Sequence, residues 1–109
     1  MNKTIAIASL AIFAAVPAAL AADAKANWGQ YCAKCHGADG KGQTKMGQKL
    51  GIKDYTDAKV QAEFSDEEAL KAIREGSKDK NGKTLMKPVE GLAPEEMEAL
   101  VQYIRAFKA

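Results

Sequence analysis

The chain has 109 residues, of which 16 are lysine or arginine and 14 are aspartate or glutamate, so its formal net charge is only +2. This balance gives no reason to expect a nucleic acid or an anionic membrane surface as a partner. The length suits one small domain, and a domain of this size usually needs a disulfide, a metal or a bound group to be stable.

Residues 1–21 are predicted to be a cleavable secretory signal peptide. Lys3 precedes an apolar run at residues 5–16, and Ala19, Leu20 and Ala21 form an A-x-A cleavage signal. The apolar run is too short for a membrane-spanning helix, which needs about 20 residues. We therefore expect no stable membrane insertion, and a mature domain of residues 22–109 in the periplasm.

The mature chain is predicted to begin with a helix at residues 24–34. One apolar face of this helix would deliver Cys32 in its last turns, because the following residues recur at helical spacing: Ala24, Trp28, Tyr31 and Cys32. Gly37, Gly40 and Gly42 then favour a tight loop. Residues 44–59 have no sustained apolar period, so at most one short helix is expected there.

The next helix is predicted at residues 66–75. Ser65 and Glu68 form a capping box at its start, and Gly76 supplies a stop signal at its end. Residues 77–92 hold turn-forming residues and no alternating apolar pattern, so we expect a loop without strands.

The clearest helix of the chain is predicted from Pro94 to the C-terminus. Proline suits the first position of a helix, and an apolar stripe follows it: Met97, Leu100, Val101, Ile104 and Phe107. Ala93 falls at the N-cap position, where alanine offers no side-chain acceptor.

Both cysteines and the only histidine lie within five residues, in the order Cys32-Ala33-Lys34-Cys35-His36. This is the C-x-x-C-H haem attachment pattern. Two cysteines at this spacing on a helical turn can reach the two vinyl groups at one edge of a porphyrin. The adjacent histidine would then be an axial ligand of the iron.

Three other interpretations of the motif are weaker. A zinc site would normally take four ligands, and the chain has only three cysteine and histidine residues. A thioredoxin-type redox pair expects a preceding strand in a βαβ pattern, which the sequence lacks. An exported cysteine pair would ordinarily form a disulfide, but the neighbouring histidine favours haem.

With these motifs the chain resembles the class I c-type cytochromes, which are small exported electron carriers. The resemblance includes Gly37 after the histidine, a later loop methionine, and a final amphipathic helix with Leu100 and Tyr103. It implies an all-α, cytochrome c-like fold, with N- and C-terminal helices packed around one covalent haem c. It also implies that Trp28 packs where these two helices cross.

The sixth position of the iron is open to methionine, lysine, water or nothing, because no second histidine exists. Met97 lies on the inward stripe of the last helix, where a thioether usually fills space, and Met46 lies closer to the motif. Met86 is followed by Lys87 and Pro88, which is similar to the family's distal ligand segment. We therefore expect His36 and Met86 to bind the iron.

The expected function is that of a non-enzymatic carrier of single electrons between larger redox proteins. The alternatives are a dedicated haem subunit or partner of a periplasmic dehydrogenase or oxidase, and a haem-based ligand sensor. We expect a monomer or a weak dimer. Five lysines would steer the protein toward acidic docking patches on its partners if the lysines surround an exposed haem edge: Lys34, Lys41, Lys45, Lys83 and Lys87.

Overall fold

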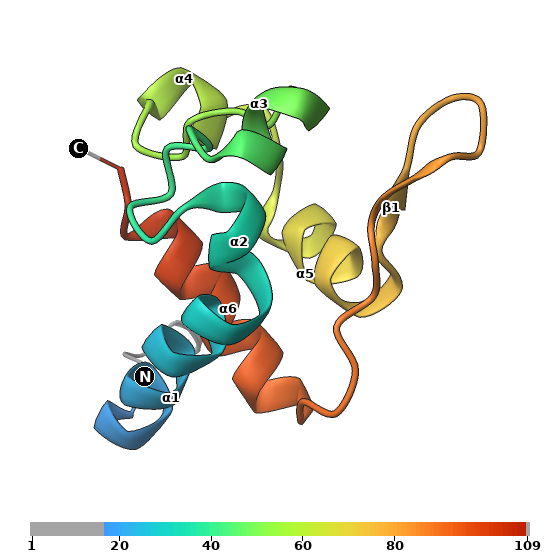
Figure 1. Cartoon of the computed structure of the whole chain (residues 1–109). Helices are drawn as coiled ribbons and strands as arrows, with labels where there is room; N and C mark the ends of the chain where they lie inside the picture. Colours follow the sequence, from blue (N-terminus) through green and yellow to red (C-terminus); the bar gives the residue numbers. More distant parts are fainter. Residues whose placement is uncertain (1–16, 109) are drawn as a thin grey trace, which may run out of the picture.

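The computed structural model describes residues 17–108, which form a mostly helical domain with one small hairpin (Figure 1). In chain order the elements are α1 (Ala18–Asn27), a π-helical turn η2 (Trp28–Cys32), α2 (Ala33–His36), α3 (Lys45–Leu50), α4 (Ala58–Gln61), α5 (Asp66–Glu75), β1 (Ser77–Lys78), β2 (Thr84–Met86) and α6 (Pro94–Arg105). The expectation of a mainly helical fold is confirmed.

The first helical segment begins earlier than predicted, at Ala18 instead of residue 24. It therefore includes the last residues of the predicted signal peptide, whose residues 1–16 lie outside the described part of the chain. Cleavage after Ala21 stays a prediction, and it would leave most of α1 in the mature protein.

A π-helical turn at Trp28–Cys32 corrects the predicted apolar face of this segment. The N–H of Ala33 donates to the carbonyl of Trp28, five residues back. Because this turn is wider than an α-helical one, Cys32 stays on the face of Trp28, and both side chains are buried. Tyr31 is rotated outward and is 41% exposed, whereas the sequence placed it inside.

The core lies where α1 and η2 pack against α6, and the two segments cross in Figure 1. Trp28 is buried at this crossing, with its ring 5.8 Å from that of Tyr103 and 5.1 Å from that of Phe107. The predicted place of Trp28 is therefore confirmed. Leu100, Val101 and Ile104 of the predicted stripe are buried, but α6 ends at Arg105 and not at the C-terminus, so Phe107 packs from the turn that follows the helix.

The middle of the chain holds two short helices, α3 and α4, where at most one was expected. Each begins at a polar N-cap: Thr44 Oγ1 accepts from Gly47 N–H, and Asp57 Oδ1 accepts from Lys59 N–H. These caps satisfy amides that the first turn of a helix leaves unpaired. Short capped helices of this kind need no long apolar period, which is why the pattern missed one of them.

Helix α5 has the predicted bounds and the complete capping box of Ser65 and Glu68. The expectation of a loop without strands after it is wrong. Strands β1 and β2 form an antiparallel hairpin in which Ser77 pairs with Met86. The loop between them is ordered by Asp79, whose Oδ1 accepts from two backbone amides. In Figure 1 this loop extends away from the helices.

Candidate functional site

A cavity of about 250 Å³ lies between α5, α6, the cysteine motif and the hairpin. It is lined by Cys32, His36, Tyr55, Phe64, Glu68, Ala69, Ala72, Ile73, Met86, Leu100 and Ile104. Three of the four predicted site residues therefore face one space, although His36 and Met86 are fifty positions apart in the sequence. The fourth, Cys35, is half-buried in the same turn of chain.

Both cysteines carry free thiols, so the structure contains no disulfide between them. Burial, followed by the nearby Cys35 sulfur, raises the pKa of Cys32 to about 11. Before haem attachment, Cys32 is therefore a protonated thiol in the apolar wall of the cavity.

The imidazole of His36 is held between aromatic rings. It stacks on Tyr55 with centroids 5.3 Å apart, and the Trp28 ring lies 5.5 Å away. Burial lowers the pKa of His36, which favours the neutral imidazole that binds metals. Its Nδ1 is buried and has no hydrogen-bond partner in the described part of the chain.

The motif turn is fixed by hydrogen bonds on two sides. Trp28 Nε1 donates to the carbonyl of Gly37 (2.8 Å), and Thr44 Oγ1 donates to that of Cys35 (2.6 Å). Gly47 packs so closely here that a Cβ on it would lie 2.5 Å from the Cys35 oxygen. The first turn of α3 therefore sits directly on the backbone of the motif and sets its position.

Among the methionines of residues 17–108, Met86 is the one that lines the cavity. Met46 is 37% exposed, and Met97 is partly buried against the core without reaching the cavity lining. Met86 is thus the methionine of the described residues that shares a cavity with His36, and its role as an iron ligand stays a prediction.

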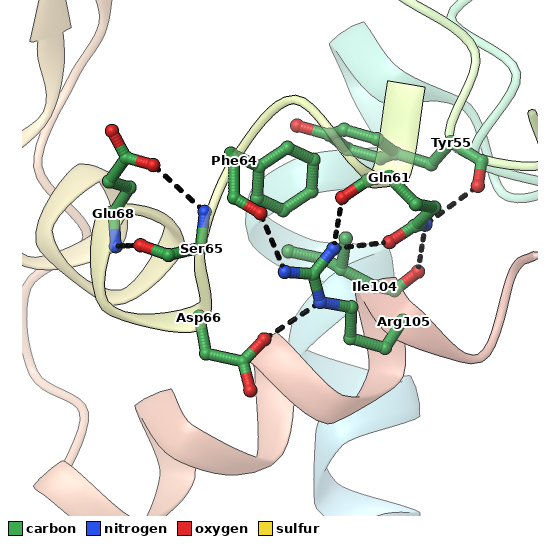
Figure 2. A network of polar contacts seen from close by, with 8 residues as sticks. All are labelled: Tyr55, Gln61, Phe64, Ser65, Asp66, Glu68, Ile104 and Arg105. Carbon is green, nitrogen blue, oxygen red and sulfur yellow. Dashed lines mark hydrogen bonds and ion pairs between the residues drawn. The ribbon is translucent and has the colours of Figure 1, made fainter. Parts of the chain in front are cut away.

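Two aromatic residues of the cavity wall, Tyr55 and Phe64, were not assigned to the site from the sequence. They come from stretches without an apolar period, and a polar network holds them (Figure 2). Gln61 Nε2 donates to the carbonyls of Tyr55 (2.7 Å) and Ile104 (2.9 Å). The network thereby ties the aromatic wall to the end of α6.

Arg105 completes this network from α6. Its guanidinium donates to Gln61 Oε1, to the backbone oxygens of Gln61 and Phe64, and to Asp66 Oδ1, at distances of 2.6 to 2.8 Å. It also lies 4.4 Å from the centre of the Phe64 ring. One planar cation thus fixes the chain on both sides of Phe64, as Figure 2 shows.

The site fits haem better than the other candidates. Within residues 17–108 no group of three or more histidine, cysteine or acidic residues is arranged to hold a metal ion, which disfavours a zinc site. The only strands in that range form the small hairpin, so a thioredoxin-like βαβ unit is not found there. An apolar cavity lined by Cys32, an imidazole and a thioether, with Cys35 in the adjacent turn, matches the groups that hold a c-type haem.

Comparisons with known proteins agree with this assignment. The cytochrome c family model matches residues 21–108. The solved structure of the KustC0563 c-type cytochrome is 38% identical, with a TM-score of 0.68 over 79% of this chain and 98% of that one. A tyrosine-to-phenylalanine mutant of Kustc0563 gives 39% identity and a TM-score of 0.66, over 79% and 99%. No curated protein matches the chain.

The chain therefore belongs to the cytochrome c family. Its cofactor is a covalently bound haem c, and its role is electron transfer through that haem. Between Pro17 and Lys108 no helix is both long and apolar enough to cross a membrane.

Proposed function

We propose that the protein is a periplasmic carrier of single electrons whose haem is attached through Cys32 and Cys35 and ligated by His36 and Met86. One observation carries the proposal. Cys32, His36 and Met86 line the same cavity, while the other described methionines lie outside it. The haem iron supplies the chemistry, which is the reversible gain and loss of one electron.

The residues of the chain adapt the site to this role. A soft thioether from Met86 opposite the imidazole of His36 favours the reduced iron and raises the reduction potential. If His36 and Met86 both bound the iron in its two oxidation states, they would keep structural rearrangement small. They also leave no open position for a substrate, which favours a carrier over an enzyme or a ligand sensor.

Absorption spectroscopy of the purified protein tests this ligation. Ferric haem with a thioether ligand has a weak charge-transfer band in the far red, which we expect in the native protein and in Met46→Ala. Met86→Ala should lose the band, and its reduced form should bind carbon monoxide. Loss of the band in Met46→Ala with its survival in Met86→Ala would overturn the assignment.

Mass spectrometry of the same material tests processing and attachment. The proposal requires a denatured mass equal to residues 22–109 plus one haem, in protein recovered from the periplasm. A chain without covalent haem, or one that retains residues 1–21, would contradict it.

The expected partners are redox proteins with acidic docking patches, which a monomer or weak dimer would meet in short encounters. The five lysines expected to take part in docking are all exposed, and two of them, Lys83 and Lys87, lie on either side of Met86 in the sequence. Leu85, which is 38% exposed, lies between them. Surface lysines around a small apolar contact would steer an acidic partner toward the hairpin side of the cavity.

Salt dependence tests this docking proposal. Electron-transfer rates with an acidic redox protein should fall as the ionic strength rises, because the Debye length shortens. Lys83→Gln/Lys87→Gln should weaken that dependence more than the control Lys49→Gln/Lys59→Gln, which removes two lysines far from Met86 in the sequence. Electron-transfer rates that do not change with ionic strength in any variant would refute the proposal.

A further inference from the structure

The end of α5 touches the backbone of the Met86 segment at a glycine. Gly76 has a φ of 77°, and a Cβ built on it would lie 2.5 Å from the carbonyl oxygen of Met86 and 2.9 Å from the nitrogen of Pro88. Real Cβ atoms essentially never approach other atoms closer than 3.0 Å. The Met86 segment can therefore keep this position only while residue 76 has no side chain.

Two further contacts fix the same segment against α5. Ser77, next to Gly76, pairs with Met86 across the hairpin. Three residues beyond Met86, the N–H of Val89 donates to the carbonyl of Ile73 in the last turn of α5 (2.9 Å). The backbone on both sides of Met86 is thus held to α5, and the side chains of Ile73 and Met86 line one cavity.

We propose that Gly76 is a positioning residue for the axial thioether, because its bare backbone sets how far the Met86 side chain enters the cavity. This proposal rests on the proposed ligation by His36 and Met86. A side chain at position 76 meets backbone atoms, which cannot rotate away as a flexible side chain would. The Met86 carbonyl must then move away from α5, and the thioether moves with it, although coordination tolerates only small displacements.

Other glycines of the chain provide a matched control. Any L-residue at position 76 is strained by the positive φ, so that strain must be separated from the contact. Gly82 lies in the same hairpin with a φ of 83°, and Gly51 has a φ of 69°, yet a Cβ at either position meets nothing within 4 Å. Alanine at these positions tests the positive φ without the contact; Gly51, with a ψ of 34°, lies in the milder left-handed region, whereas Gly76 has a ψ of −176°.

The experiment compares Gly76→Ala and Gly76→Asn with Gly82→Ala and Gly51→Ala, all as holoprotein with one covalent haem. Asparagine has the same Cβ as alanine, and both are strained at the ψ of −176° that Gly76 combines with its positive φ, a region open essentially to glycine alone. We expect both variants of Gly76 to lose most of the far-red band and to bind carbon monoxide when reduced. Both controls should match the native protein in these two measurements.

Four outcomes would contradict the proposal. Gly76→Ala and Gly76→Asn could retain the band and exclude carbon monoxide, so that Gly76 does not position the ligand. Gly82→Ala and Gly51→Ala could lose the band to the same degree, so that strain alone is responsible. A third outcome is that both variants of Gly76 fail to accumulate as holoprotein while the controls do accumulate. Gly76 would then be required for folding and not specifically for ligand position. A native protein without the band, or Met86→Ala with it, would instead refute the underlying ligation.

Discussion

The indole of Trp28 connects three parts of the haem site. Its ring packs against α6 and lies 5.5 Å from the His36 ring, and its N–H donates to the carbonyl of Gly37 just after the motif. A buried tryptophan usually needs such a partner for its N–H. One side chain therefore combines core packing with control of the backbone that follows the histidine.

Trp28→Phe should lower the free energy of unfolding by about 1 to 3 kcal/mol, from the lost hydrogen bond and the smaller ring. Urea denaturation of the holoprotein, followed by circular dichroism, measures this. Tyr103→Phe is a suitable control because it keeps a ring beside Trp28, and it should change stability by less than about 0.5 kcal/mol. Equal losses of unfolding free energy in the two variants would mean that the hydrogen bond of the indole N–H does not stabilise the fold.

At the start of α6, half of a capping box is present. Glu96 Oε1 accepts from the N–H of Ala93 (2.9 Å), but alanine has no oxygen to accept an amide of the first turn. Ala93→Ser supplies that oxygen, and should raise stability by about 0.5 to 1 kcal/mol. Thermal melts showing no gain would contradict this.

At the scale of elements, the sequence predicted the segments that have strong local signals. Helix α5 was placed correctly because Ser65, Glu68 and Gly76 mark both of its ends. The hairpin was missed because its strands have two and three residues, too few for an alternating pattern. Asn81-Gly82 was a usable signal, since this pair favours a tight hairpin turn.

Two features of the site could not be read from local patterns at all. The exposure of Tyr31 depends on the π turn, which has no sequence signal comparable to a cap. Tyr55 and Phe64 reach the cavity wall through Gln61 and Arg105, and the contacts between Arg105 and Phe64 join residues 41 positions apart. Long-range contacts of this kind become visible only in the folded chain.

The Arg105 network predicts which of its bonds matter for stability. Arg105→Lys keeps the charge but loses the planar fork that contacts Gln61 and Phe64, and should lower stability by about 1 to 3 kcal/mol. Asp66→Asn removes only an ion-pair partner that is 52% exposed, so its effect should stay below about 1 kcal/mol. Chemical denaturation of both variants as holoproteins measures the two losses of stability. A larger loss in Asp66→Asn than in Arg105→Lys would contradict the prediction.

At the scale of the whole molecule, the cavity adjoins the apolar core, and Cys32, Ile73 and Leu100 belong to both. Helices α5 and α6, the motif turn and the hairpin all contribute to the lining, so a haem bound there would contact each of these elements. In a domain this small, a bound group usually supplies much of the stability. The fold and the cofactor are therefore expected to depend on each other.

Haem removal should consequently unfold most of the tertiary structure. Without the haem, the apolar walls of this cavity would lose the contacts that the group supplies, and the whole stability of a small domain is only about 5 to 15 kcal/mol. Haem-free protein should therefore show weak near-ultraviolet circular dichroism and no cooperative melt.

The haem-free double variant Cys32→Ala/Cys35→Ala is the control, because it cannot form a disulfide and should be equally unstable. If haem-free protein of either kind melted cooperatively within a few degrees of the holoprotein, the polypeptide would close the cavity by itself. The haem would then contribute little to the stability of the fold, and the stabilising role proposed for it would be wrong.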